Sequence, residues 1–230
     1  MNNFNEIKVI TFDGDGTLWD FEKVMRHSLK FVLAALNEID SEAGSKLDVD
    51  MLIVIRNKVA KDLKGITTNL EDIRLQAFIQ TLNYIGRPNE ELAKFLNEIY
   101  LKHRFEDIEL FDDVLQTLTQ LKKKYTIGLL SNGSSYPDRC GLENIFNFVI
   151  FSQDFGIEKP DPRIFEITMK KAQCKVPEIL HIGDSLETDI QGAKNVGIKN
   201  IWLNRNNVKN NQHFKPDREI TSLIELLDFL

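Results

Sequence analysis

The stretch of sequence that decides the fold is Lys8-Val9-Ile10-Thr11-Phe12-Asp13-Gly14-Asp15-Gly16-Thr17-Leu18-Trp19-Asp20. It begins as an apolar strand and then presents two carboxylates, two glycines and a threonine within five residues. In an open parallel sheet, ligands bind beyond the carboxyl ends of the strands, where Asp13 and Asp15 would lie. Side chains two residues apart on an extended backbone point to the same side, so both carboxylates can face one ligand. Because glycine lets the backbone turn tightly and bring its amides to an anion, the stretch predicts a site for a divalent cation and a phosphate.

Three other structures that combine aspartate and glycine do not match this stretch. A hairpin would need a second strand at once, but a helical pattern follows. A calcium loop that begins at Asp13 needs Asp or Asn, Gly and Glu at positions where this chain has Thr17, Leu18 and Val24. A dinucleotide-binding loop needs a third glycine, and that position is Trp19. Metal-assisted phosphoryl chemistry is therefore the favoured interpretation of the stretch.

Length and composition narrow the class of protein. The 230 residues suffice for one large domain or for a domain with an inserted module. A formal charge of -6 argues against binding to a nucleic-acid polymer, and the two cysteines are too few for a disulfide framework. No apolar run is long enough for a membrane span, and residues 1–6 lack the features of a signal peptide. We therefore expect a cytoplasmic protein without a membrane anchor.

The pattern of apolar residues divides the chain into two kinds of structure. Residues 7–12 form an apolar strand, and residues 20–107 show the 3.6-residue period of four amphipathic helices. After Phe111 the pattern alternates between helix and strand, which is typical of an α/β sheet. The expected strands are 126–130, 148–151, 179–182 and 200–203, and the expected helices are 112–123, 163–173 and 221–230.

These elements predict an α/β fold with a Rossmann-like parallel sheet of five or more strands, flanked by helices. The sheet domain would comprise residues 1–18 and 108–230, and residues 19–107 would form a helical module inserted after the first strand. Parallel strands end at the same edge of a sheet, so the polar residues that follow them are expected to meet.

Several loops at that edge supply residues suited to chemistry. Taken alone, each has an ordinary explanation, such as a helix N-cap for Ser131 or a solvated loop cation for Lys159. Their order along the chain carries more information than any one of them. The order is Asp13-x-Asp15-x-Thr17, a strand that ends in Ser131, Lys159-Pro160 ahead of a helix, and Gly183-Asp184 with Asp189 five residues after Asp184.

This order resembles the haloacid dehalogenase superfamily, most of whose members are Mg²⁺-dependent phosphatases. All four motifs are present and lie on both sides of the helical module. The resemblance implies that residues 19–107 are an α-helical cap and that the chain is similar to the phosphoglycolate phosphatase and pyrimidine 5′-nucleotidase subgroups. One departure is Gly14, because the family usually carries a bulkier apolar residue there.

The motif residues can be given roles in phosphate ester hydrolysis. A carboxylate is ionised at neutral pH, so Asp13 can attack phosphorus and form an aspartyl-phosphate. Asp15 would protonate the leaving group and then take a proton from the attacking water. Thr17 is expected to hold Asp15 in place through a hydrogen bond from its hydroxyl group.

The remaining motif residues would bind the cofactor and the phosphate. Mg²⁺ prefers oxygen ligands, which Asp13, Asp184 and the backbone carbonyl of Asp15 can provide, with Asp189 nearby. The phosphoryl oxygens would be neutralised and oriented by side chains and backbone amides. These groups are expected from Lys159, Ser131, Gly14, Gly16, Thr17, Asn132 and Gly133.

The expected partner is a small phosphorylated metabolite, and the protein would be a monomer or a homodimer. A phosphomutase or a 2-haloacid dehalogenase could use the same loops, and a non-catalytic binding module could use the same fold. His181 is interpreted as a core histidine with satisfied hydrogen bonds. The sequence places neither His27 nor His103 in a recognisable metal site.

Overall fold

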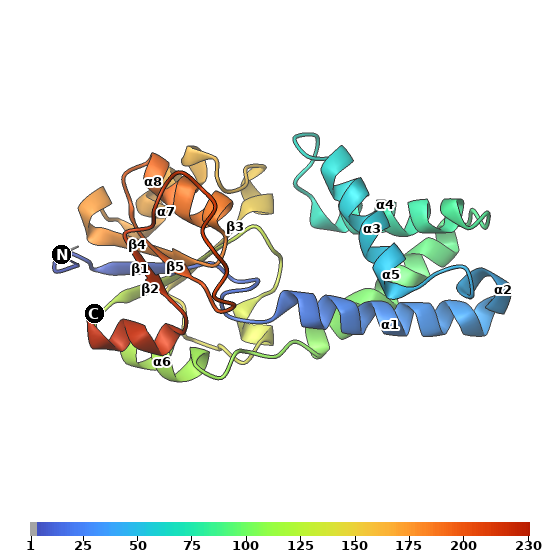
Figure 1. Cartoon of the computed structure of the whole chain (residues 1–230), viewed down its shortest axis with the longest axis horizontal. Coiled ribbons are helices and arrows are strands. Elements are labelled where there is room, and N and C mark those ends of the chain that lie inside the picture. The colour runs from blue at the N-terminus through green and yellow to red at the C-terminus, as the bar shows by residue number, and fades with distance from the viewer. Residues whose placement is uncertain (1–3) are drawn as a thin grey trace. The chain divides into compact units, whose positions relative to one another are not determined.

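The computed structural model describes residues 4–230, which divide into two compact units (Figure 1). Unit 1 contains the residues up to Asp20 together with Glu109–Leu230, and unit 2 is the segment Phe21–Ile108. The chain therefore passes between the units at residues 20–21 and 108–109, against the expected 18–19 and 107–108. Among the helices of the described part, none is both long and apolar enough to cross a membrane.

Unit 1 is built on a six-stranded parallel sheet with the order β3-β2-β1-β4-β5-β6. The strands are β1 (Val9–Phe12), β2 (Thr126–Ser131), β3 (Phe148–Phe151), β4 (Ile179–Gly183), β5 (Lys199–Leu203) and β6 (Arg218–Ile220). All four residues of β1 are buried, as expected for a central strand. Phe12 pairs with Leu129 of β2 and with Ile182 of β4, so these three strands end at one edge. The predicted α/β fold is confirmed.

One strand, β6, was not predicted. It has three residues, and the first two, Arg218 and Glu219, are charged and exposed. A short edge strand with charged side chains shows no apolar run, so the sequence pattern does not reveal it.

Helices cover both faces of this sheet (Figure 1). One face packs against α7 (Pro162–Ala172) and α8 (Gly192–Asn195), whose buried residues Ile164, Phe165 and Ala193 join a core with Val9 of β1. The other face carries α6 (Val114–Leu121) and a 3₁₀ helix, Leu223–Asp228. The predicted C-terminal helix is thus a shorter 3₁₀ segment, and further 3₁₀ turns occupy Pro137–Arg139, Ser152–Phe155 and Val176–Glu178. A π-helical turn, Leu186–Gln191, follows the β4 loop.

Unit 2 is entirely helical. Its helices are α1 (Phe21–Ile39), α2 (Ser41–Gly44), α3 (Val49–Asp62), α4 (Leu70–Tyr84) and α5 (Glu90–Glu106). The apolar faces meet in one core that includes Leu29, Val32, Leu82, Leu96 and Tyr100. Asp48, Asn69 and Asn89 accept hydrogen bonds from backbone amides in the first turns of α3, α4 and α5, which explains where these helices begin. The four predicted helices are present, with α2 as an additional single turn.

Candidate active site

The structure brings four of the predicted site residues together at the carboxyl edge of the sheet. Asp13 follows β1, Asp184 follows β4, Asp189 lies in the π-helical turn, and Lys159 lies in the loop that precedes α7. One carboxylate oxygen from each of Asp13, Asp184 and Asp189 lies within 4.8 Å of the others. Their close approach follows from the register, because Phe12 and Ile182 are neighbours in the sheet and Asp13 N–H donates to Ile182 O (2.9 Å).

Lys159 is the cation at the centre of this group. Its ammonium donates to Asp13 Oδ1 (2.6 Å), Asp189 Oδ1 (2.6 Å) and Leu130 O (2.8 Å), which uses all three of its protons. Burial disfavours the charged form, but Asp13 and Asp189 outweigh this effect and raise the pKa of Lys159 above its usual value. The ammonium therefore stays charged and offsets the negative charge of both carboxylates.

The buried carboxylates have different affinities for protons. Burial raises the pKa of Asp13 well above its usual range, and Asp189 and Asp184 add to this effect while Lys159 opposes it. Burial and the nearby Asp189 raise the pKa of Asp184 to about 6. For Asp189 burial acts in the same direction, but the charge of Lys159 and the hydrogen bond with His181 outweigh it, so its pKa lies below the usual range. Asp189 is thus the carboxylate that remains ionised most readily.

Asp189 is held by a chain of buried side chains. His181 Nε2 lies 3.0 Å from Asp189 Oδ1, and His181 Nδ1 lies 2.9 Å from Thr11 Oγ1. Burial lowers the pKa of His181, so the ring is neutral at pH 7. The nitrogen that faces the ionised carboxylate must then carry the proton, and the Thr11 hydroxyl donates to Nδ1. Ser185 N–H donates to the other oxygen of Asp189 (3.0 Å), so both oxygens have partners.

The cluster fits a hard divalent cation. Its possible ligand atoms are carboxylate oxygens, which Mg²⁺ prefers. The ammonium of Lys159 binds two of the three carboxylates, so when all three are ionised the group carries excess negative charge that a divalent cation would neutralise. The residues present therefore suit Mg²⁺.

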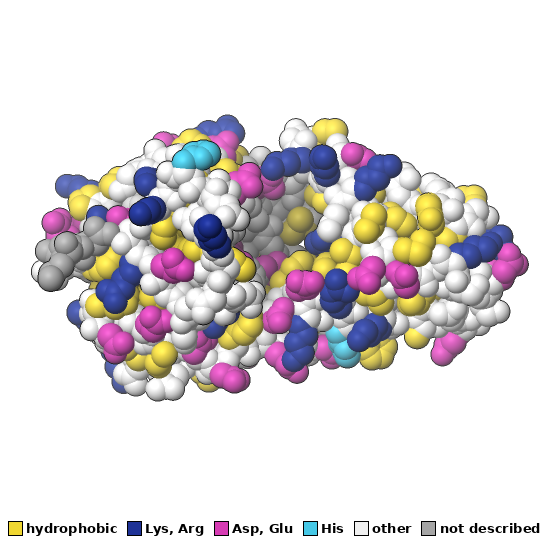
Figure 2. Space-filling view, in the orientation of Figure 1, with side chains coloured by type: hydrophobic (Ala, Val, Ile, Leu, Met, Phe, Trp, Pro, Cys, Tyr) yellow, Lys and Arg dark blue, Asp and Glu magenta, His cyan; other side chains and the backbone are white. Residues whose placement is uncertain are grey.

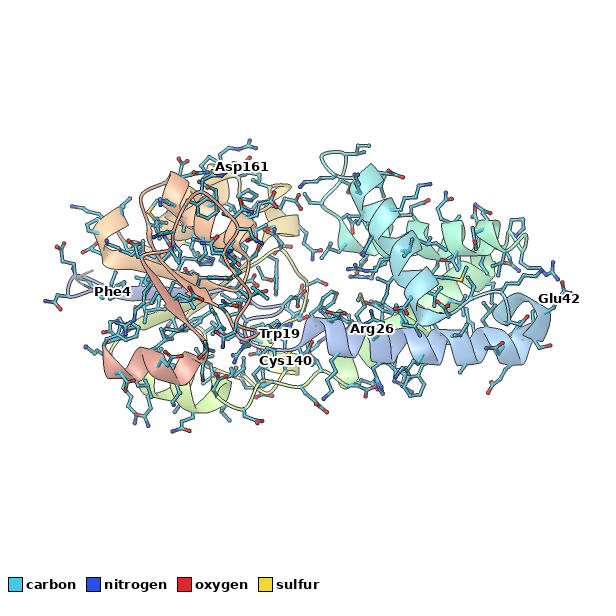
Figure 3. All side chains as sticks on the ribbon, viewed as in Figure 1. Phe4, Trp19, Arg26, Glu42, Cys140 and Asp161 are labelled. Atoms are coloured by element: carbon cyan, nitrogen blue, oxygen red, sulfur yellow. The ribbon has the colours of Figure 1, made fainter. Side chains whose placement is uncertain are left out.

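Asp15 is held by Trp19 rather than by Thr17. The indole Nε1 of Trp19 donates to Asp15 Oδ1 at 2.5 Å, and Trp19, labelled in Figure 3, is fully buried. The predicted bond from Thr17 to Asp15 is wrong, because the Thr17 hydroxyl donates to Asp184 Oδ1 (3.1 Å). The reason is the turn at Gly16, whose φ of +84° directs the loop toward Asp184.

Trp19 also explains why residue 14 is a glycine. A Cβ atom at Gly14 would lie 2.7 Å from Trp19 Cζ2 and 3.2 Å from Ser131 Oγ. The indole ring therefore occupies the space that a larger side chain at position 14 would need. Gly14, which departs from the family pattern, is therefore explained by the packing of Trp19, five residues later.

Gly16 and Gly133 provide room for the carboxylates. A Cβ atom at Gly16 would lie 2.5 Å from Asp184 Oδ2, and one at Gly133 would lie 2.7 Å from Asp15 Oδ2. Their amides are bound within the protein, since Gly16 N–H donates to Trp19 O and Gly133 N–H to Ser131 Oγ (both 2.9 Å). A phosphate contact by these two amides stays a prediction.

The end of β2 fixes the loop that carries Lys159. Asn132 Oδ1 accepts hydrogen bonds from Ser152 Oγ (2.6 Å) and Lys159 N–H (2.8 Å), and its Nδ2 donates to Lys159 O (3.0 Å). Ser131 is buried beside Gly14, at the end of β2. The side chain of Asn132 therefore fixes the Lys159 loop, and the predicted phosphate contact is left to its backbone amide and the second proton of Nδ2.

Sequence patterns did not predict that Trp19 contacts Asp15 or that His181 contacts Asp189. His181 is a buried histidine with satisfied hydrogen bonds, as predicted, but one of those bonds connects it to the carboxylate cluster. The alternation of β4 contained a signal: His181 lies two residues before Gly183, on a strand whose loop supplies Asp184. For Trp19, two features of the sequence could have indicated the contact with Asp15: its position four residues after Asp15, and the glycine at position 14, which leaves room for a large side chain.

Comparisons with known proteins identify the family of this chain. A family model described as haloacid dehalogenase-like hydrolase matches residues 7–197. A glyceraldehyde 3-phosphate phosphatase of Methanopyrus kandleri is 27% identical and covers 96% of each chain. A pyrimidine 5′-nucleotidase of Streptococcus pneumoniae is 28% identical over 97% of this chain and 94% of its own.

A solved structure gives the same assignment. The crystal structure of a 2-haloacid dehalogenase from Pseudomonas syringae pv. Tomato superimposes with a TM-score of 0.82, at 29% identity and 97% coverage of both chains. The family model spans most of this chain, including all four motifs that meet at the edge of the sheet. The chain therefore belongs to the haloacid dehalogenase-like hydrolase family.

Proposed function

We propose that this hydrolase releases inorganic phosphate from a small phosphomonoester, with Asp13 as the nucleophile and Mg²⁺ as the cofactor. Several curated relatives that match along most of their length are named as phosphatases of small metabolites, which supports this reaction class. The observation that carries the proposal is the position of Asp15, a carboxylate two residues after Asp13 that a buried indole N–H holds.

The proposed reaction has two half-reactions that share one acid–base group. An oxygen of Asp13 attacks phosphorus, the bond from phosphorus to the leaving group breaks, and Asp15 gives its proton to the departing oxygen. Asp15 then takes a proton from water, which attacks phosphorus and releases Asp13 as a carboxylate. One residue serves both steps because the first step leaves Asp15 in the form that the second requires.

The nucleophile must be ionised in a buried site. Its two negative neighbours, Asp184 and Asp189, disfavour ionisation, and the ammonium of Lys159 at 2.6 Å favours it. Mg²⁺ would be held by Asp13, Asp184 and the backbone carbonyl of Asp15, with Asp189, whose two oxygens already accept hydrogen bonds, beside the ion. When bound, this cation would supply the charge that neutralises the carboxylates and the phosphoryl oxygens.

The substrate's phosphate group would be oriented by the loops after β1 and β2. Ser131 Oγ accepts a hydrogen bond from Gly133 N–H, so its own O–H can donate to a phosphoryl oxygen. The amides of Gly14 and Asn132 would add further donors, and Lys159 would add positive charge. Lys159 would act chiefly by attracting the dianion, because its three protons are bound to protein oxygens.

A second candidate is hydrolytic dehalogenation, because one similar solved structure is a 2-haloacid dehalogenase. That reaction expels a halide ion, which is stable without a proton, so it requires no acid near the leaving group. A carboxylate held at position 15 by a buried tryptophan has a use in phosphate ester hydrolysis but none in halide displacement. This difference favours the phosphatase.

The test is a panel of candidate substrates with the purified protein. Phosphate release would be measured from p-nitrophenyl phosphate, phosphoglycolate, glyceraldehyde 3-phosphate, nucleoside monophosphates and sugar phosphates, with Mg²⁺ and with EDTA. Halide release from 2-haloacids would be measured in parallel. Mg²⁺-dependent phosphate release is the expected result. Halide release without phosphate release would overturn the proposal, and the absence of both would favour a mutase or a binding module.

A further inference from the structure

A second group of side chains that could bind a metal ion lies within unit 2 and shares no residue with the acidic cluster of unit 1. His27 lies in α1, His103 lies in the last turns of α5, and Asp107 follows that helix. Asp107 Oδ2 is 3.1 Å from His27 Nε2 and 2.7 Å from His103 Nδ1. One ligand atom from each of the three residues lies within 4.8 Å of the others. The sequence alone did not indicate this cluster, because it depends on how α1 docks on α5.

The two imidazole rings are oriented by an aromatic neighbour. Phe31, one turn after His27 on α1, stacks on the His103 ring at 3.6 Å with an interplanar angle of 8°. The same phenyl ring meets the edge of the His27 ring at 5.0 Å. Both rings are thereby held with one nitrogen each toward Asp107, which reduces the ordering that a bound ion would require.

The geometry and chemistry of the three groups suit zinc. In a tetrahedral site with bonds of about 2.0–2.1 Å, neighbouring ligand atoms lie about 3.3 Å apart. The two distances to Asp107 are 3.1 and 2.7 Å, so the side chains would have to separate by only a few tenths of an ångström. His103 lies in the last turn of α5 and Asp107 directly follows the helix, four residues later, a spacing at which two side chains can chelate one ion. Two nitrogens favour Zn²⁺ over Mg²⁺, which prefers oxygen alone.

We propose that His27, His103 and Asp107 form a zinc-binding site on unit 2, distinct from the acidic cluster of unit 1. Three protein ligands leave one position of the tetrahedron for water. Exposed histidine surface on this helical unit is visible in Figure 2, so an ion can reach the site from solvent. The chain enters unit 2 on α1 and leaves it after α5, so a bound ion would join the first and last helices of the unit.

The proposal can be tested by counting bound metal without any enzyme assay. The full-length protein would be dialysed against micromolar Zn²⁺ in excess Mg²⁺, and bound zinc would be measured by elemental analysis. The wild type is expected to bind one zinc per chain more than the double variant His27→Gln/His103→Gln. Zinc that enters the acidic cluster would bind to both proteins and cancel in the difference. His213→Gln is the matched control, since it removes a histidine from unit 1, and it should bind as the wild type does.

Two further measurements identify the ligands. Co²⁺ is expected to give the visible absorption of a tetrahedral nitrogen-containing site in the wild type, and Asp107→Asn should weaken that absorption. Zn²⁺ should raise the melting temperature of the wild type more than that of the double variant. Equal zinc content in the wild type and in a folded double variant would overturn the proposal, whatever reaction the acidic cluster catalyses.

Discussion

Trp19→Phe is the substitution that isolates the group holding Asp15. It removes the indole N–H that donates to Asp15 Oδ1 at 2.5 Å, and it keeps an aromatic ring in the fully buried position. In the proposed reaction Asp15 transfers protons in the chemical step, so its misplacement should act on kcat rather than on KM. Loss of phosphate binding would instead appear in KM.

The expected fall in kcat can be estimated from the hydrogen bond that Trp19→Phe removes. A hydrogen bond to a charged group contributes about 1.5–3 kcal/mol, and the side chain is too deeply buried for water to replace the donor easily. Since each 1.36 kcal/mol is a factor of ten in rate, kcat should fall by about 10- to 150-fold. The cavity left by the smaller ring adds a cost in stability, which a thermal melt reports separately.

The assay is a double-mutant cycle with steady-state kinetics. Trp19→Phe, Asp15→Asn and the double variant would be compared with the wild type on the best substrate of the panel. If Trp19 acts through Asp15, Trp19→Phe should have little further effect once Asp15 is Asn. A folded Trp19→Phe protein whose kcat is within twofold of wild type would refute the reasoning, as would full additivity in the cycle.

Three further predictions concern packing, stability and pH. Gly14→Ala should lower stability by about 1–3 kcal/mol in urea titrations, because its Cβ atom would meet the Trp19 ring at 2.7 Å, and the loss should shrink in a Trp19→Phe background. Asp113→Ala should lower the free energy of unfolding by about 3 kcal/mol. The Asp113 carboxylate accepts two hydrogen bonds from Arg205 (2.9 Å each) and two from the start of the C-terminal 3₁₀ segment. A loss below about 1 kcal/mol would contradict this prediction. The pKa of Asp184 is raised to about 6, so protons compete with Mg²⁺ for this carboxylate below that pH. The apparent affinity for Mg²⁺ should therefore be about tenfold weaker at pH 5 than at pH 7. An affinity independent of pH would argue against Asp184 as a ligand.

Much of the sheet and the identity of the clustered carboxylates could be predicted from sequence. Apolar runs such as Val9–Phe12 mark buried strands, and parallel strands bring the residues that follow them to one edge. For this reason Asp13, Asp184 and Lys159 meet in the structure although they are far apart in the chain. Edge strand β6 was not predicted, because its residues are too few and too polar to form an apolar pattern.

Partners of individual polar atoms could not be predicted in the same way. The threonine hydroxyl at position 17 was assigned to Asp15, but a left-handed turn at Gly16 sends it to Asp184. The cluster of His27 with His103 depends on the rotation of two helices about their axes, which the 3.6-residue period restricts only to a broad face. Side-chain hydrogen bonds depend on positions to within a fraction of an ångström, and sequence patterns do not carry that precision.

The most direct test of the central claim is to trap the covalent intermediate at Asp13. The protein would be mixed with a ³²P-labelled substrate from the panel and Mg²⁺, quenched in acid, and digested for mass spectrometry. Label on the peptide that contains Asp13, absent from Asp13→Asn, is the result that the proposed mechanism predicts. Phosphate release by Asp13→Asn at a near wild-type rate, or label on another residue, would contradict it.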